Sequence, residues 1–300
     1  MRQKYKELRF RADTLAVIDQ ANEILDEYAD ADLVVTLRQL YYQFVSRDLM
    51  ANTVQNYKRL GSIVSDGRMA GLIDWSRIED RGRVPEMPSQ WPSAASLARA
   101  AANAFRLPRW NGQRSYVEVW IEKQALVGVL APLADELHVT LMANKGYSSQ
   151  SAMRDAALRY QRNIEVMGRM VGKPVQPCLA YLGDHDPSGN DMVRDIRERM
   201  ELFGVRGLLV DRLALTREQI NEHQPPPNPA KVTDSRFEAY RREHGDYSWE
   251  LDALDPPLLQ SIVRDWVVGR RDDRTYRMML RDEDRQRSAL EDAAARMEDD

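Results

Sequence analysis

The second half of the sequence alternates short apolar runs with longer helical stretches, and this alternation constrains the fold more than any other feature. The apolar, β-rich runs are residues 116–121, 139–142, 178–182 and 207–210. The helical stretches between them are residues 124–137, 149–167 and 190–203. Strands that alternate with helices of this length are typical of a mostly parallel sheet with helices on both faces. We therefore predict a three-layer α/β domain here, followed by a helical C-terminal extension.

The first third of the sequence has a helical pattern instead. Apolar residues at near-helical spacing predict a helix over about residues 11–29, and Thr36 begins a capping box at the start of a second helix. A third, basic helix is expected over about residues 53–70, and two short strands could follow at 72–73 and 78–84. This order predicts a mostly α, winged-helix DNA-binding domain, although a generic three-helix packing unit has the same order.

The stretch between these two patterns is punctuated by prolines, at positions 85, 88, 92 and 108. With a short helix expected over residues 94–105, it predicts a linker that is only partly flexible. The 300 residues suffice for two domains that each bury a core. We place the N-terminal domain at residues 1–112 and the α/β domain with its C-terminal extension at residues 113–300.

Charge is distributed unevenly along the chain. Residues 36–114 contain 12 Lys and Arg against 6 Asp and Glu, whereas residues 281–300 contain 8 acidic and 4 basic residues. A basic segment in an otherwise acidic chain is what a polyanion-binding surface would look like, although charge also fluctuates along sequences without such a role. Within it, we expect Lys58, Arg59 and Arg68 of the third helix to contact DNA phosphates; a solvated helix face is the alternative.

Composition excludes several classes of protein. The single cysteine, Cys178, cannot form an internal disulfide or a thiolate zinc site, and four scattered histidines make zinc chemistry improbable. No window approaches about 18 consecutive apolar residues, so we expect no membrane span. The first twenty residues are charged and lack the apolar core of a signal peptide. These features predict a cytoplasmic protein in a reducing compartment.

Three acidic residues follow predicted strands, at the sheet edge where open α/β domains bind ligands. Glu122 follows the first strand, and Asp184 and Asp186 follow the third strand in the run GDHDPSG. Clustered carboxylates repel one another unless a cation or proton neutralises them, and hard oxygen ligands suit Mg²⁺. Taken singly, each could instead be a helix N-cap. Strand alternation would point His185 away from both aspartates, so we interpret it as structural.

Helical geometry places the two adjacent tyrosines of the second helix on different faces. Tyr41 is four residues after Leu37 and belongs to the apolar stripe, whereas Tyr42 lies off the stripe and four residues after Arg38, on the same face. We therefore expect Tyr41 in the core and Tyr42 exposed beside Arg38. A tyrosine hydroxyl is a poor nucleophile at its ordinary pKa of about 10, but a neighbouring guanidinium favours the phenolate and can hold a phosphate.

Several motifs together resemble one family. IEKQAL (residues 121–126), NKGYSSQSA (144–152) and YLGDHDPSG (181–189) are similar to the TOPRIM domain of the topoisomerase VI A subunit and of the meiotic double-strand-break transesterases. The resemblance implies a Rossmann-like sheet domain preceded by a winged helix. It also covers RQLYY (38–42), which resembles the motif whose second tyrosine attacks DNA in that family, and WELDAL (249–254), a recurrent element with no role that we can assign from chemistry.

The resemblance also implies site residues, a cofactor and partners. Glu122, Asp184 and Asp186 would bind Mg²⁺ near the scissile phosphate, Tyr42 would be the nucleophile with Arg38 beside it, and Lys123 would contact DNA. The family's geometry implies a homodimer in which the tyrosine of one protomer works with the metal site of the other. Its ATPase lies on a separate subunit, so such a partner is possible here.

Three functions remain open at this point. The first is a Mg²⁺-dependent DNA-cleaving transesterase of the topoisomerase A-subunit type with Tyr42 as nucleophile. The second is a TOPRIM nuclease, of a defence or mobile-element system, in which metal-activated water attacks and Tyr42 is structural. The third is a non-catalytic DNA-binding module, which the carboxylate set argues against because unneeded clustered acids are costly to keep.

Overall fold

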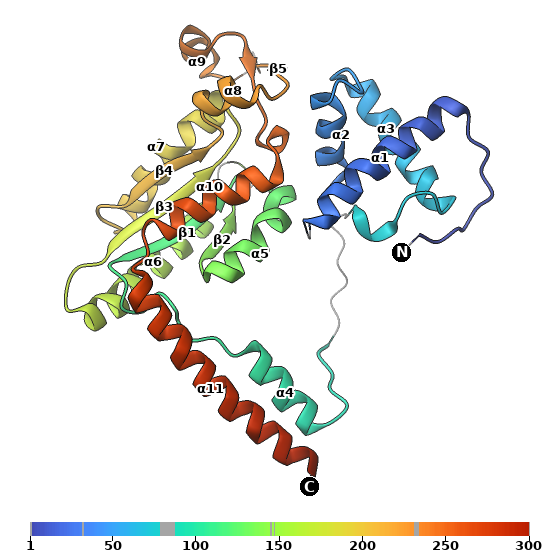
Figure 1. Cartoon of the computed structure of the whole chain (residues 1–300). Helices are drawn as coiled ribbons and strands as arrows, with labels where there is room; N and C mark the ends of the chain where they lie inside the picture. The colour runs from blue at the N-terminus through green and yellow to red at the C-terminus, as the bar shows by residue number, and fades with distance from the viewer. Residues whose placement is uncertain are drawn as a thin grey trace.

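The described residues form an N-terminal helical unit and a larger α/β unit (Figure 1). This computed structural model describes residues 2–31, 33–78, 88–144, 146, 148–230 and 234–299. None of the helices within those ranges is both long enough and apolar enough to cross a membrane.

The N-terminal unit is built from three helices, as the sequence predicts. They are α1 (Ala12–Asp30), α2 (Leu37–Ser46) and α3 (Val54–Met69). Their apolar faces meet in one core, in which Ile24, Leu40 and Leu60 are almost completely buried. The predicted capping box is present at the start of α2, where the Thr36 side chain accepts from the backbone N–H of Gln39 and the Gln39 side chain accepts in return.

The predicted wing differs where the structure describes it. Residues 72–73 are not a strand, because the amides of Leu72 and Ile73 both donate to the carbonyl of Gly67 and close the end of α3. A short 3₁₀ turn, η1 (Trp75–Arg77), follows, and Ile78 makes a single parallel bridge with Val35. The remainder of the second predicted strand lies outside the described residues.

The α/β unit contains the predicted parallel sheet. Its strands are β1 (Ser115–Ile121), β2 (Thr140–Ala143), β3 (Gln176–Leu182) and β4 (Leu209–Ala214), in the order β2-β1-β3-β4. All three strand pairings are parallel. The central strands β1 and β3 are buried along nearly their whole length, as expected for a sheet covered on both faces.

Helices cover both faces of this sheet. The crossover helices are α5 (Val127–Leu137), which follows the turn η2 (Gln124–Leu126), α6 (Gln150–Val171) and α7 (Pro187–Leu202). Helix α6 packs on β1 and β3 and α7 packs on β4, while α5 and the later helix α10 (Pro256–Val268) pack together on the other face. The α/β, three-layer prediction is thereby confirmed.

The residues after β4 form smaller elements and a long helical arm. The smaller elements are α8 (Arg217–His223), the two-residue strands β5 (Asn228–Pro229) and β6 (Tyr247–Ser248), α9 (Phe237–His244) and the turn η3 (Leu251–Ala253). The last helix, α11 (Asp273–Asp299), runs out from the sheet beside α4 (Ala94–Ala104), which comes from the linker (Figure 1). The linker is therefore partly anchored on the C-terminal helix.

Candidate functional site

The predicted carboxylates lie at the carboxyl edge of the sheet, and helix α2 of the N-terminal unit packs against η3 beside them. Glu122 follows β1 directly. Its Oε2 accepts from the backbone N–H of Asp184 at 2.9 Å and from the Tyr181 hydroxyl at 3.3 Å. Burial, together with the nearby charges of Asp184 and Asp186, raises the pKa of Glu122 to about 7. The structure thus brings the three acids of the sequence prediction into one electrostatic environment.

Asp184 faces the C-terminal part of the chain. Its Oδ1 accepts from the backbone N–H of Leu251 at 2.8 Å and lies 3.0 Å from the Lys123 ammonium. Burial raises the pKa of Asp184, and Lys123 opposes that shift. The carboxylate is therefore held between the end of β1 and the segment that precedes α10.

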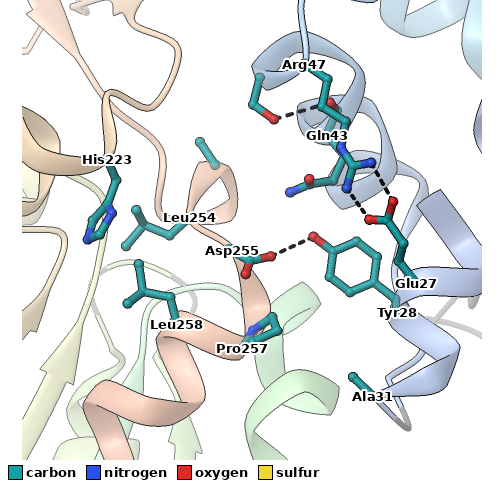
Figure 2. Close-up of a pocket in the computed structure, with 12 residues that line it drawn as sticks. Glu27, Tyr28, Ala31, Gln43, Arg47, His223, Leu254, Asp255, Pro257 and Leu258 are labelled. Carbon is teal, nitrogen blue, oxygen red and sulfur yellow. Dashed lines mark hydrogen bonds and ion pairs between the residues drawn. The ribbon is translucent and has the colours of Figure 1, made fainter.

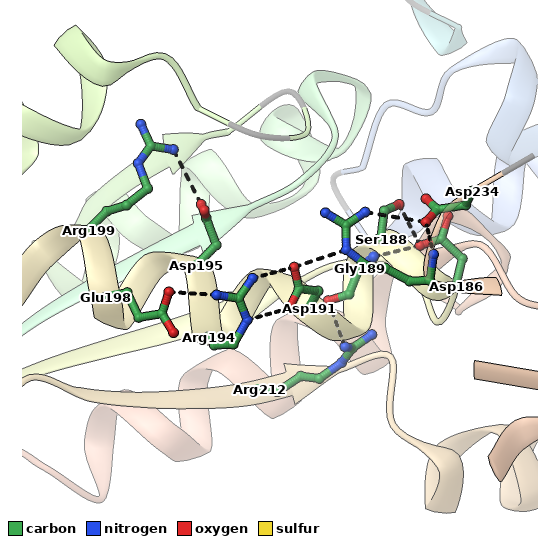
Figure 3. A network of polar contacts seen from close by, with 11 residues as sticks. Asp186, Ser188, Gly189, Asp191, Arg194, Asp195, Glu198, Arg199, Arg212 and Asp234 are labelled. Atoms are coloured by element: carbon green, nitrogen blue, oxygen red, sulfur yellow. Dashed lines mark hydrogen bonds and ion pairs between the residues drawn. The ribbon is translucent and has the colours of Figure 1, made fainter. Parts of the chain in front are cut away.

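Asp186 is the N-cap of α7, which is the alternative role that the sequence allowed. Its Oδ1 accepts from the backbone N–H of Gly189 at 2.6 Å and from the Ser188 hydroxyl at 2.8 Å (Figure 3). A Cβ atom on Gly189 would lie 2.1 Å from the carbonyl oxygen of Asp184, so only glycine fits this turn. The run GDHDPSG is thus shaped to place two carboxylates at the start of α7.

Lys123, which we expected to contact DNA, is engaged by acids of its own chain. Its ammonium lies 2.9 Å from Glu250, 3.0 Å from Asp184 and 3.7 Å from Asp252, and its side chain is only 18% exposed. Burial works to lower the pKa of Lys123, but these three carboxylates outweigh it and raise the pKa. Lys123 therefore joins the strand-end acids to the WELDAL segment.

Tyr41 and Tyr42 have the different environments that helical geometry predicts. Tyr41 packs in the N-terminal core, and its hydroxyl donates to the carbonyl of Thr53 and accepts from the Thr53 N–H. Tyr42 lies outside that core but is not exposed as we expected: only 4% of it is accessible, because α2 docks on the α/β unit. The Glu250 carboxylate and the Asn228 side chain are close enough to its hydroxyl to affect its acidity.

The acidity of Tyr42 also differs from the expectation. Burial and the charge of Glu250 raise the pKa of its hydroxyl to about 12, whereas Arg38 lowers it by less. Arg38 instead pairs with the WELDAL segment, at 3.4 Å from Glu250 and 3.9 Å from Asp252. Tyr42 is therefore a neutral phenol in this arrangement, and Arg38 alone does not activate it.

Glu250 and Asp252 are site residues that the sequence analysis did not identify. The recurrent WELDAL element was their only signal, since they follow no strand of the main sheet. Asp252 is 3% exposed, and neither of its carboxylate oxygens has a hydrogen-bond partner among the described residues. Burial raises the pKa of Asp252 to about 6. A buried carboxylate without hydrogen bonds is costly, which is typical of functional sites.

The site carries excess negative charge. Among the described residues it contains five carboxylates and three cationic groups, which leaves a surplus of two negative charges in this part of the chain when all are ionised. The carboxylates, which we call the acid cluster, are Glu122, Asp184, Asp186, Glu250 and Asp252. The cations are Arg38, Lys123 and the buried Arg212.

Whether the acid cluster can bind a metal ion depends on how its carboxylates are arranged. In the described part of the chain, no three Asp, Glu, His or Cys side chains form a group that could hold a metal ion as they stand. The reason lies in their present partners, since Asp184 is engaged by Lys123 and Asp186 caps a helix. The donor chemistry nevertheless suits Mg²⁺, because the cluster offers hard carboxylate oxygens and excess negative charge.

His185 has the structural role that we inferred. Its ring is buried and makes edge contacts with Tyr240, His244 and Trp249, and its Nδ1 lies 2.9 Å from the Tyr240 hydroxyl. The backbone of His185 also pairs with that of Trp249. Its role is thus to fix the start of the WELDAL segment beside the strand-end acids.

The predicted DNA-contacting residues of α3 have different surroundings. Lys58 is exposed, and Arg59 is half-exposed in an ion pair with Asp13 at 3.4 Å. Arg68 instead donates to the carbonyls of Trp75 and Ile78, and burial lowers its pKa. Arg68 thus closes the turn after α3, whereas Lys58 and Arg59 present their charge at the surface.

A cleft of about 440 Å³ lies between helices α1 and α2 on one side and residues 253–258 on the other (Figure 2). The Tyr28 hydroxyl donates across it to Asp255 at 2.7 Å, while Arg47 forms a two-pronged pair with Glu27 on the helical side. The two units are therefore joined by polar contacts to residues 227–228 and 250–255, and their apolar cores are separate.

The sequence was also compared with known proteins. No protein-family model matches it, and no curated protein is significantly similar to it.

Proposed function

We propose that this protein is a Mg²⁺-dependent DNA-cleaving transesterase in which Tyr42 attacks a phosphodiester. The observation that carries the proposal is a continuous chain of ion pairs from Arg38, which lies one helical turn before Tyr42 on α2, to the strand-end acids. Arg38 pairs with Glu250, Glu250 with Lys123, and Lys123 with Asp184. Two motifs that lie far apart in the sequence, the tyrosine helix α2 and the carboxylate edge of the sheet, are thereby neighbours.

Each residue of the site has a proposed role. Glu122, Asp184 and Asp186 would hold Mg²⁺, which when bound polarises the phosphodiester and neutralises its developing charge. Arg38, whose guanidinium shares a helix face with Tyr42, would orient the phosphate by bidentate hydrogen bonds. Lys123 would exchange its contacts with the acid cluster for contacts with the phosphate as DNA enters.

DNA binding is assigned to the N-terminal unit. We infer that its three helices belong to a winged helix, with Lys58 and Arg59 of α3 contacting phosphates. The two adjacent basic side chains are accessible at the surface of α3, which supports this assignment.

The assembly is proposed to be a homodimer, with a separate ATPase subunit as a further candidate partner. The family resemblance implies that the tyrosine works with the metal site of the other protomer. In this structure Tyr42 lies against the acid cluster of its own chain. We infer that this cis arrangement is the resting state of each protomer.

A second candidate function is a nuclease in which water, not Tyr42, attacks the phosphate. The burial of Tyr42 and the rise of its pKa to about 12 favour this alternative, because both disfavour a phenolate nucleophile. The acid cluster and its Mg²⁺ would serve either reaction. The products differ, since only the transesterase leaves a tyrosine joined to a DNA 5′ end.

The deciding experiment traps that product. Wild-type protein is incubated with 5′- and 3′-labelled DNA and Mg²⁺, denatured, and analysed for label that migrates with protein. We expect trapping with wild type and its complete loss, together with loss of cleavage, in Tyr42→Phe. Tyr41→Phe is the matched control: it removes a hydroxyl with hydrogen bonds only inside the N-terminal unit, so its activity should survive.

Each other outcome selects an alternative. Cleavage by Tyr42→Phe at the wild-type rate would identify water as the nucleophile and the protein as a nuclease. If wild type shows no Mg²⁺-dependent cleavage of DNA or RNA, and Mg²⁺ does not change its thermal stability, the protein is a non-catalytic binding module.

A further inference from the structure

Three carboxylates of the acid cluster converge on a single cation, the ammonium of Lys123. Its Nζ lies 2.9 Å from Glu250 Oε2, 3.0 Å from Asp184 Oδ1 and 3.7 Å from Asp252 Oδ1. One positive charge at this point therefore faces three negative charges. A position that holds a cation among hard oxygen atoms from three residues has the chemistry of a divalent-cation site.

Asp252 is the member of this group whose bonding capacity is least used. It is 3% exposed, and neither of its carboxylate oxygens has a hydrogen-bond partner among the described residues. Its nearest cations, Lys123 and Arg38, lie at 3.7 and 3.9 Å, which is too far for a charge-assisted hydrogen bond. A buried carboxylate is costly unless its oxygens are bonded, so the ammonium leaves Asp252 unsatisfied at the position that it faces.

Backbone contacts hold these acids in place without help from Lys123. The N–H of Leu251 donates to Asp184 Oδ1 at 2.8 Å, and Trp249 and His185 exchange backbone hydrogen bonds of 2.8 and 3.0 Å. The two acids of the WELDAL segment lie on either side of Leu251, so this register sets both of them beside the end of β3. All three hydrogen bonds lie within the α/β unit, and the arrangement of acids therefore does not depend on the ammonium or on helix α2.

We propose that these three acids form a second divalent-cation site, whose place the Lys123 ammonium takes until DNA enters. The ligands are Asp184, Glu250 and Asp252, and carboxylate oxygens of this kind suit Mg²⁺ or Mn²⁺. The inference rests on the proposed function in one respect, the movement of Lys123 towards the phosphate. A divalent ion would neutralise two of the three charges where the ammonium neutralises one, and it would give Asp252 a direct ligand bond. Lys123 is then an internal counter-ion that makes loading of this site depend on DNA.

The test counts the Mn²⁺ ions that bind per chain in the absence of DNA, by electron paramagnetic resonance of free Mn²⁺ at constant ionic strength. Lys123→Met removes the ammonium but keeps an unbranched side chain, and we expect it to bind one Mn²⁺ more than wild type. Asp252→Asn in the Lys123→Met background should weaken binding of this additional ion at least about tenfold. Glu243→Gln in the same background, at an exposed acid on α9, is the matched control and should retain the ion.

Thermal unfolding gives a second measurement on the same variants. Lys123→Met leaves the three acids with fewer positive charges, so its melting temperature should fall below that of wild type. Mn²⁺ should restore it, because an ion that binds only the folded chain stabilises that state, whereas Na⁺ at equal ionic strength should not. If the variant is unfolded without metal, recovery of its circular dichroism spectrum on addition of Mn²⁺ takes the place of the melting temperature.

Two results would overturn the inference. One is a Lys123→Met protein that binds no more Mn²⁺ than wild type and gains no stability from it. The other is unchanged Mn²⁺ binding when Asp252→Asn is added. Failure of the proposed function gives a different result: an additional Mn²⁺ in Lys123→Met, without covalent trapping of DNA by wild type, leaves the cation site standing and refutes the transesterase. Trapping by wild type without the additional ion in Lys123→Met refutes this inference alone.

Discussion

Replacement of Glu283 by Gln should destabilise the protein strongly at neutral pH and much less in acid. Glu283 lies on α11 and is fully buried. Its carboxylate accepts from Arg109 Nε at 2.9 Å and Nη2 at 2.6 Å, from the backbone N–H of Leu107 at 2.9 Å, and from Arg287. These contacts join Leu107 and Arg109, at the end of the linker, to the C-terminal helix α11. They therefore fix the linker at the point where it enters the α/β unit.

The magnitude follows from the pKa of Glu283. The hydrogen bonds from Arg109, which outweigh the effect of burial, lower it from 4.5 to about 2. A shift of this size corresponds to about 3 kcal/mol of folding free energy, because one pKa unit is ~1.36 kcal/mol. The folded-state pKa is depressed, so this stabilisation is complete above the unfolded value of 4.5 and is lost as pH falls towards 2.

The assay is urea unfolding of wild type and Glu283→Gln at pH 7, 5 and 3, followed by circular dichroism. We expect a difference of about 3 kcal/mol at pH 7 and 5, falling to less than half of that at pH 3. Glu165→Gln is the matched control, because Glu165 pairs with Arg169 on the solvent-facing side of α6, where the two side chains are 63% and 75% exposed. It should change stability by less than about 0.5 kcal/mol.

Two results would refute this reasoning. A Glu283→Gln difference as small as that of Glu165→Gln at pH 7 would show that the buried cluster contributes little. A large difference in unfolding free energy that does not change with pH would show that Glu283→Gln acts through packing or hydrogen-bond geometry. The charge of the carboxylate would then not be the cause.

Three further predictions concern the acid cluster, helix α3 and the proposed dimer. Asp184→Ala should abolish cleavage while gel-shift affinity for DNA is retained or increased, since a negative charge near the phosphate is removed; retained cleavage would exclude Asp184 as a metal ligand. The double variant Lys58→Gln, Arg59→Gln should weaken DNA binding and reduce the slope of log affinity against log salt concentration by about two units. Arg68→Gln should mainly lower the melting temperature. An unchanged salt slope in the double variant would show that Lys58 and Arg59 are solvated and do not contact phosphates. Mixed Tyr42→Phe and Asp184→Ala proteins should regain cleavage if sites form between protomers, and no activity in the mixture would establish cis catalysis.

Local structure was largely predictable from the sequence because its signals are local. Helical and strand periodicity reflect which face of an element is buried, and each element repeats the signal several times. The capping box at Thr36 depends on two residues three positions apart. The core position of Tyr41, the different face of Tyr42 and the placement of Glu122 and Asp184 at strand ends follow from the same short-range geometry.

The partners of these side chains were decided by the tertiary structure. Glu250 meets Arg38 from 212 residues away and Lys123 from 127 residues away, and no periodic pattern marks the segment that carries it. Arg68 is engaged by carbonyls and Lys123 by carboxylates, although in the sequence both are simply basic residues. Docking of α2 against η3 buries Tyr42 and raises its pKa, which a helical wheel cannot show. The sequence therefore determined which chemical groups the site contains, whereas their burial, charge partners and acidity arise only when segments distant in the chain pack together and exclude water.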